Sequence, residues 1–398
     1  MSQAHAQRAH ALLGASKAAQ WINCPPSARL QESIPDKRSD YADEGTAAHE
    51  YSEWKLRRQL LPCDSKQRAK LQTAMQYFVA GNQYYSSEME DAVESYVETV
   101  SERFMAALAR SPDAVLLLEE RLDFSEWVPD GYGTGDVVII ADQVMEIIDL
   151  KYGKGVPVSA VGNSQMKLYA LGALSAYNYL YDIREIRMTI VQPRLDSVST
   201  DTILVDDLLA WAESIVRPAA ALADAGEGDL ASGDHCRWCK VKATCRARAD
   251  AAMSVLAHEF QDPRLMTLEE IGNTLYIVEQ MQTWAKDVQE YAYEQAKSGT
   301  AVPRWKLVEG RSDRKIADIE AAKAKLTAAG YDETKLLKDP VLRGIGELEK
   351  LVGKKQFAEL LEGIVIKPPG KPVLVPETDP RAPVNSVEND FAGEDFEK

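Results

Sequence analysis

The 398-residue sequence contains no run of about 18 apolar residues, the length at which a stretch becomes a candidate membrane span. Its first residues, MSQAHAQRAHALLGASK, lack the hydrophobic region of a secretory signal peptide. These two absences predict a cytoplasmic protein that does not enter a membrane. The sequence also lacks internal repeats, and its length is sufficient for two or three domains.

Basic residues are fewer than acidic ones, 46 against 62, so the formal net charge is −16. Proteins that bind nucleic acids usually carry a basic surface, and this balance argues against one that covers the whole molecule. A local basic channel is still compatible with it, because total charge does not describe a groove. Part of the acidic excess lies in residues 377–398, which we expect to form a disordered tail.

Cysteine is scarce, with five residues, and in a cytoplasmic protein a small set favours metal or cofactor binding over disulfides. Three follow the spacing Cys236-x₂-Cys239-x₅-Cys245, and Cys24 is the obvious fourth. Four thiolates can bind Zn²⁺ or an iron–sulfur cluster, and the spacing alone leaves both open. The basic residues around this triad argue against a buried, unliganded set. Cys63 has no such pattern.

The most informative stretch is Gly131–Tyr152, GYGTGDVVIIADQVMEIIDLKY. It predicts two short strands, Asp136–Ile140 and Val144–Leu150, joined by an Ala-Asp-Gln turn. The β-branched content and length of both runs suit adjacent strands of one sheet. The charged residues lie where one strand begins and its neighbour ends, so we expect them to meet at one point.

These strand ends carry the chemistry of a metal site. Asp136 and Asp149 can together hold Mg²⁺ or Mn²⁺, which prefer oxygen ligands. Lys151 lies two residues after Asp149, on the same face of the strand, and can orient or polarise an attacking water. This is the minimum set for metal-assisted phosphodiester hydrolysis. An Asp-x-Lys pattern alone is weak, because any edge strand can end this way; the upstream Gly-Thr-Gly-Asp strengthens it.

Two predicted helices bring further candidates. The helix expected to begin with Thr46 near its N-cap carries His49, which can add an imidazole ligand. The helix predicted over Ser164–Tyr177 carries Gln165 and Tyr169 one turn apart on one face. A lone histidine or a Gln–Tyr pair on a helix is more often structural. Beside the Asp-x-Lys strand, however, the pair can position a substrate strand.

The rest of the chain predicts an α/β core in residues 1–250. Further strands are expected over 115–122 and 185–192, and Glu119 and Glu120 could contribute an acid, although paired solvated charges are the more ordinary interpretation. A helical insertion occupies about residues 65–112. An α-rich extension follows over residues 251–376, beginning with a long amphipathic helix that starts at a Thr267–Glu270 capping box and ends near Gly299.

In this order, the residues resemble the PD-(D/E)XK nucleases of the RecB-like, iron–sulfur-bearing type over about residues 12–250. The matching positions are Cys24; Gly45, Thr46 and His49 in G-T-x-x-H; Asp136 in G-x-x-D; Asp149 and Lys151 in D-x-K; Gln165 and Tyr169 in Q-x-x-x-Y; and Cys236, Cys239 and Cys245. Each motif alone is unspecific, whereas six in the correct order are very specific.

The resemblance implies a restriction-endonuclease-like core, a mixed central sheet flanked by helices, and a metal-dependent DNA exonuclease. It implies His49, Asp136, Asp149 and the Leu150 carbonyl as ligands of Mg²⁺ or Mn²⁺. It also implies a structural [4Fe–4S] cluster on the four cysteines, with Zn²⁺ as the alternative. Linear DNA ends, double- or single-stranded, are the expected partner.

The full length also resembles a phage and prophage family filed under a domain of unknown function, whose members often lie near phage recombination genes. We therefore expect DNA-end resection for phage recombination in a bacterial host, with a phage single-strand annealing or single-strand-binding protein as a second partner. The alternative is a non-cleaving DNA-binding or recombination-scaffold protein with the same fold. The acidic charge and the long C-terminal extension keep that alternative open.

Overall fold

The computed structural model describes residues 12–35, 39–253 and 267–305, together with Lys355. The chain divides into two compact units, one formed by residues 1–261 and 280–306 and the other by residues 262–279 and 307–398. Every candidate site residue belongs to the first unit. The predictions for the acidic tail and for most of the extension fall outside the described residues.

The centre of the first unit is a five-stranded sheet whose spatial order follows the chain. The strands are β1 (Val115–Asp123), β2 (Tyr132–Ala141), β3 (Val144–Leu150), β4 (Glu185–Gln192) and β5 (Ser197–Leu204). Neighbours are antiparallel except β3 and β4, which are parallel. A parallel pair needs a crossover, and helix α6 (Ser164–Tyr181) lies within it. The predicted mixed α/β sheet flanked by helices is confirmed.

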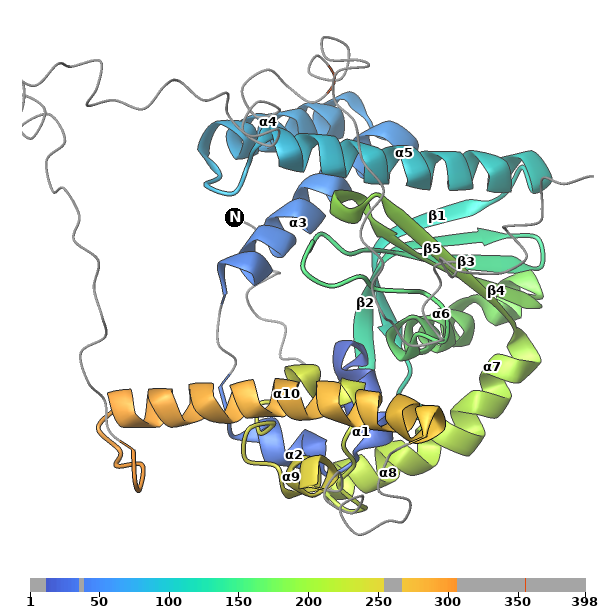
Figure 1. The fold of residues 1–398 in the computed structure, drawn as a ribbon. Helices are drawn as coiled ribbons and strands as arrows, with labels where there is room; N and C mark the ends of the chain where they lie inside the picture. The colour runs from blue at the N-terminus through green and yellow to red at the C-terminus, as the bar shows by residue number, and fades with distance from the viewer. Residues whose placement is uncertain (1–11, 36–38, 254–266, 306–354, 356–398) are drawn as a thin grey trace, which may run out of the picture. The chain divides into compact units, whose positions relative to one another are not determined.

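Helices cover both faces of this sheet (Figure 1). On one face α3 (Asp40–Leu60), α4 (Ser65–Gly81) and α5 (Ser87–Arg110) pack with the inward side chains of the strands. On the other face α6 packs with the alternate side chains of the same strands. Val137 and Ile139 of β2 belong to the first cluster, and Val138 and Ile140 belong to the second, as the alternation of a strand requires.

The expected helical insertion is present as two helices, α4 and α5. Each begins with a side-chain cap, because the first amides of a helix have no partner within it. Asp64 and Gln67 form a reciprocal capping box before α4, and the Ser86 hydroxyl accepts from the Met89 amide at 3.2 Å before α5.

Residues 197–225 carry no clear signal of regular structure in the sequence. They form β5 and then α7 (Val205–Trp211), a π-helical turn over Ala212–Val216, and α8 (Arg217–Ala225). Val205, Leu208 and Ala220 of this stretch join the cluster around α6. The short helices α1 (Ala18–Asn23) and α2 (Ser27–Glu32) lie beside α8, with α1 also in contact with α6.

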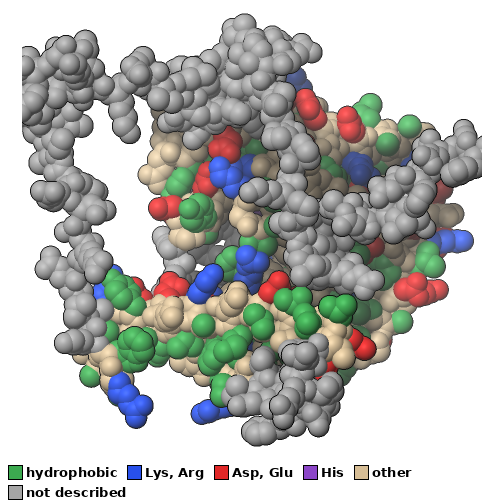
Figure 2. All heavy atoms as spheres, in the orientation of Figure 1, with side chains coloured by type: hydrophobic (Ala, Val, Ile, Leu, Met, Phe, Trp, Pro, Cys, Tyr) green, Lys and Arg blue, Asp and Glu red, His purple; other side chains and the backbone are tan. Residues whose placement is uncertain are grey.

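The long helix expected after Thr267 is α10 (Leu268–Lys297). Its capping box is confirmed, because Glu270 Oε2 accepts from the Thr267 amide at 2.7 Å and Thr267 Oγ1 accepts from the Glu270 amide at 3.2 Å. Hydrophobic side chains remain visible along α10 (Figure 2). Tyr276 and Tyr293 of this helix are each about half exposed. Among the described residues, no helix is both long and apolar enough to cross a membrane.

Candidate functional site

Three carboxylates lie side by side across β1, β2 and β3. In the β1–β2 ladder Leu118 faces Val137 and Glu120 faces Gly135, so Glu119 and Asp136 stand opposite each other between these pairs. In the β2–β3 ladder the last pair is Val137 and Ile148; Asp136 precedes Val137 by one residue and Asp149 follows Ile148 by one, so the two lie just beyond this pair. The expected meeting of the two aspartates at one end of the sheet therefore follows from strand register.

The backbone of β1 leaves the regular strand conformation at Glu119. Glu119 has a φ of 54°, in the left-handed region that residues other than glycine seldom adopt. Leu116 and Leu118 face the cluster of α3–α5, whereas Leu122 faces the cluster of α6, so the alternation of the strand slips between them. Backbone strain of this kind is concentrated at functional sites. The slip brings the Glu119 carboxylate beside Asp136, which the sequence pattern of β1 did not reveal.

His49 reaches the carboxylates from α3. Its Nδ1 lies 3.3 Å from Asp136 Oδ1, while the other oxygen of Asp136 accepts the Leu150 amide at 2.7 Å. The expectation that Thr46 lies near the N-cap of this helix is wrong. The helix begins at Asp40, and the Ser39 hydroxyl caps it by accepting the Ala42 amide at 3.3 Å. His49 therefore lies in the third turn of α3.

The lysine of the Asp-x-Lys motif is held by a chain of contacts that ends on α6. Lys151 Nζ lies 2.7 Å from Asp149 Oδ2 and donates to Gln165 Oε1 at 3.2 Å. Gln165 Nε2 in turn donates to the Tyr169 hydroxyl at 3.0 Å. The structure thus brings Gln165 and Tyr169 together with the Asp-x-Lys strand end, as the sequence predicted.

Two glycines make room for this arrangement. A Cβ on Gly133 would lie 2.6 Å from a ring carbon of Tyr169, so the glycine lets the aromatic ring pack directly on β2. A Cβ on Gly135 would lie 2.7 Å from Leu122 Cδ1. The two glycines that precede Asp136 in Gly-Thr-Gly-Asp therefore let Tyr169 and Leu122 pack closely against β2.

The buried charges shift one another's pKa values. Burial opposes the charge of His49, but the attraction of Asp136, their hydrogen bond, and the charges of Asp149 and Glu119 outweigh it and raise the pKa of His49 to about 9. Burial also acts against the Asp136 carboxylate, yet His49, the Leu150 amide and Lys151 lower its pKa. The site is therefore arranged to keep Asp136 negatively charged.

Asp149 differs from Asp136. Burial raises the pKa of Asp149, and the neighbouring Asp136 adds to the rise, although Lys151 opposes both. Its Oδ2 is buried, and its partner is the Lys151 ammonium group, 2.7 Å away.

A cavity of about 350 Å³ opens beside these residues, lined by Ala42, Gly45, Thr46, His49, Glu50, Glu119, Thr134 and Asp136. Single ligand atoms of His49, Glu119 and Asp136 lie within 4.8 Å of one another, and within the part of the chain that the structure describes this is the one set of three such groups. A Cβ on Gly45 would meet nothing within 4 Å, so the glycine widens the cavity. The residues fit a divalent cation with room for further ligands.

The four cysteines of the predicted set come from both ends of the first unit. Cys24 follows α1, Cys236 and Cys239 lie in and after a 3₁₀ turn at Asp234–Trp238, and Cys245 precedes α9 (Arg246–Met253). Burial raises the pKa of Cys239 to about 11, and the charges of the other three thiols add to the rise. The charges of all four thiols thus act on one another, although among the described residues no three of the sulfur atoms lie within 4.8 Å of one another. The Cys63 thiol instead donates to the Arg57 carbonyl at 3.5 Å.

The segment Cys236–Cys245, here called the cysteine lobe, is held by polar contacts with the rest of the protein. The Lys240 amide donates to Gln31 Oε1 of α2 at 2.8 Å. Asp287 of α10 lies 2.8 Å from Lys242 Nζ and 2.7 Å from Arg248 Nη1, and Arg248 also donates to the Lys242 carbonyl. Several of the cations that surround the cysteines in sequence thus have carboxylate or backbone partners, and the second half of α10 is fastened to the lobe.

The family described as "Protein of unknown function (DUF2800)" matches residues 10–382 of this chain. The match covers the sheet, the strand-end site, the cysteine lobe and most of the C-terminal extension, so the chain belongs to this family. The description of the family names no activity.

Proposed function

We propose that this member of the DUF2800 family is a metal-dependent DNA exonuclease that hydrolyses phosphodiester bonds. The observation that supports it best is the convergence of Asp136, Asp149 and Lys151 with His49 at one end of the sheet. Carboxylates, an imidazole and an ammonium group at one point are the equipment of metal-assisted hydrolysis.

In this proposal His49, Asp136 and Asp149 hold Mg²⁺ or Mn²⁺ together with the Leu150 carbonyl, and Glu119 is an added ligand or a base for a bound water. When bound, the cation would lower the pKa of a water and offset the negative charge on the phosphate. The protein's own contribution is to keep Asp136 ionised and to hold Asp149 beside it through the ion pair with Lys151.

Lys151 orients the attacking water or stabilises the charge that develops on the phosphate. Its ammonium group is held by Asp149 and by the Gln165 carbonyl oxygen, and Gln165 is held in turn by Tyr169. Gln165 and Tyr169 therefore position the lysine, and we propose that they also position the DNA strand.

For Cys24, Cys236, Cys239 and Cys245 we propose a [4Fe–4S] cluster with a structural role, with Zn²⁺ as the alternative. Support comes from the gathering of four thiols from both ends of the unit, three of them buried. Ligation would join the N-terminal helices to the lobe that follows α8, as a covalent link would.

The proposed biological setting rests on the family resemblance described above. We propose that the protein acts in the bacterial cytoplasm on linear DNA ends during phage recombination, beside a single-strand annealing or single-strand-binding protein. A non-cleaving DNA-binding or scaffold protein is the second candidate, and the acidic net charge and the long C-terminal extension keep it open.

The deciding experiment is digestion of end-labelled linear duplex beside a closed circle, using anaerobically purified protein with Mg²⁺ or Mn²⁺. We expect loss of label from the linear DNA alone. Lys151→Met should remove the activity, and Asp207→Asn, a change at an exposed aspartate of α7, should keep it. Intact linear DNA under both metals, with the protein folded and its cysteine site filled, would support the scaffold instead.

A further inference from the structure

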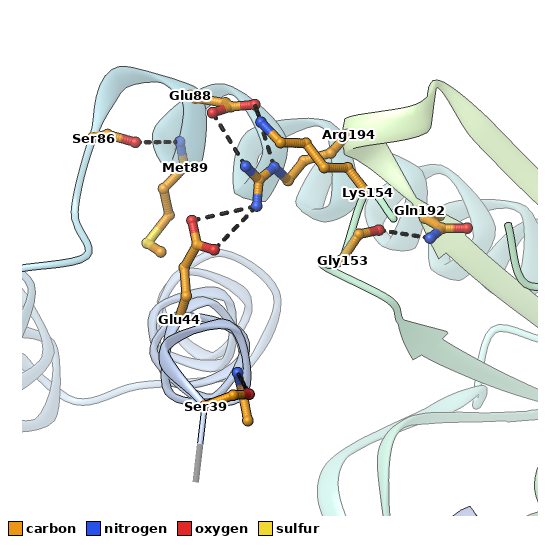
Figure 3. Close-up of polar contacts among 10 residues, drawn as sticks. Ser39, Glu44, Ser86, Glu88, Met89, Gly153, Lys154, Gln192 and Arg194 are labelled. Carbon is orange, nitrogen blue, oxygen red and sulfur yellow. Dashed lines mark hydrogen bonds and ion pairs between the residues drawn. The ribbon is translucent and has the colours of Figure 1, made fainter. Parts of the chain in front are cut away.

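Arg194 is a buried cation outside the proposed catalytic set. It lies in the 3₁₀ turn Pro193–Leu195 directly after β4, and its side chain is 7% exposed. Its Nη1 is 3.3 Å from both carboxylate oxygens of Glu44, and its Nε and Nη2 are each 3.3 Å from an oxygen of Glu88 (Figure 3). The guanidinium also stacks on Tyr152, 4.7 Å from the ring centre.

These contacts join three parts of the fold at one point. Glu44 lies in the second turn of α3, Glu88 is the second residue of α5, and Tyr152 directly follows the lysine of the Asp-x-Lys motif. Figure 3 shows the guanidinium between the beginnings of the two helices. Arginine suits this position because its planar fork can bond two carboxylates at once, which an ammonium group does less well.

The beginning of α3 has little apolar packing of its own. Its first four residues are exposed, and its buried side chains start at Ala47. The same segment forms one wall of the cavity, through Ala42, Gly45 and Thr46. The ion pair between Glu44 and Arg194 therefore restrains a wall of the candidate metal site that the hydrophobic core does not restrain.

We propose that Arg194 is a positioning residue for the metal site, because by holding Glu44 it keeps α3 where His49 meets Asp136. This inference rests on the proposed metal-dependent function. His49 follows Glu44 by five residues, less than a turn and a half, so a displacement at Glu44 is transmitted along the helix to the imidazole. Groups that orient metal ligands are worth about 10- to 100-fold in metal affinity.

The test compares Glu44→Gln with Glu88→Gln. Both remove one carboxylate from the same guanidinium, and Glu88→Gln also removes the partner of Lys154, 3.1 Å from Glu88 Oε1. Only α3 carries a candidate ligand, so Glu88→Gln is the control. Mn²⁺ affinity is measured by electron paramagnetic resonance on the full-length, folded proteins. We expect Glu44→Gln to weaken Mn²⁺ binding about tenfold. Glu88→Gln should leave it unchanged while lowering the melting temperature to a similar extent.

His49→Ala supplies the second arm. If the ion pair acts through the imidazole, Glu44→Gln should have no further effect on Mn²⁺ affinity in the His49→Ala background, since interacting residues are non-additive. Equal Mn²⁺ affinity in Glu44→Gln and Glu88→Gln, whether both weakened or both unchanged, would overturn the positioning role. A wild-type protein that binds no Mn²⁺ at all would count against the proposed function itself.

Discussion

The strand-end site and the cysteine lobe both gather groups that bind metals, but they are built in opposite ways. At the strand ends the charged groups already have partners within the protein, His49 with Asp136 and Lys151 with Asp149, and a cavity leaves one side open. In the lobe three of the four thiols are buried, and burial raises the pKa of Cys239. We infer that the first site can exchange its ion within an intact fold, whereas the second makes its ion part of the fold.

The largest expected effect lies at the strand ends. Asp149→Asn removes a metal ligand, and we expect DNA cleavage to fall by about 10³-fold or more, equivalent to about 4 kcal/mol of lost transition-state stabilisation. Because burial and Asp136 raise the pKa of Asp149, its charge adds little stability, and the melting temperature should stay near that of the wild type. Activity is read from the end-labelled duplex, and calorimetry supplies the melting temperature. Substantial residual cleavage would remove Asp149 from the catalytic set.

The opposite pattern is expected at the lobe. Cys24→Ser should lower the free energy of unfolding by at least about 3 kcal/mol, because a ligand that joins distant parts of the chain is lost. Cleavage by the protein that stays folded should persist. Denaturant unfolding and metal analysis measure both consequences. Cys63→Ser is the control, since that thiol bonds within the region of α3 and not in the lobe. Equal stability and equal metal content in the two variants would mean that Cys24 does not have the proposed structural role, and the two sites would then not differ in this way.

The contact between α10 and the cysteine lobe provides a further test of how the lobe contributes to stability. Asp287→Asn leaves Arg248 buried without its carboxylate, and we expect a loss of about 3 kcal/mol at pH 7. Burial opposes the charge of Asp287, but Lys242 and Arg248 outweigh it and lower its pKa. The contribution is therefore complete above the pKa of an unfolded aspartate, about 3.9, and is lost as the pH falls through the lower folded value.

Urea unfolding of the wild type and Asp287→Asn at pH 7, 4 and 3 measures this dependence. The difference in stability between the two proteins should shrink toward zero as the pH falls. A difference that stays constant over this range would mean that the charge of Asp287 does not carry the contact.

The smallest effect is expected at the wall of the cavity. Gly45 lies within α3, and alanine there should stabilise the helix by about 0.5–1 kcal/mol while its methyl group enters the cavity and slows cleavage. Gly272→Ala in α10 is the matched control, because its added Cβ likewise meets nothing within 4 Å. The control should gain stability without a change in cleavage. Unaltered cleavage by Gly45→Ala would mean that the substrate does not approach this wall.

Local patterns in the chain were enough to predict much of the fold. The strands over 144–150 and 185–192 and the helix beginning at Ser164 are confirmed, because apolar periodicity and turn residues mark them directly. β5 was not assigned. Side chains along β5 alternate between half-buried and exposed, and none is fully buried. Its sequence, SVSTDTIL, therefore carries a weak apolar signal, and its pairing with β4 decides its structure.

Within the candidate site, the sequence by itself determined which groups are present. Asp136, Asp149 and Lys151 were predicted to meet because strands of known polarity place their ends together, and the four cysteines were grouped by spacing and elimination. Only the tertiary structure decided the contributions of Glu119 and Arg194. The left-handed backbone of Glu119 turns its carboxylate toward Asp136, and the carboxylates of Glu44 and Glu88 from two helices hold Arg194. Neither leaves a periodic signal, because each depends on contacts between residues far apart in the chain.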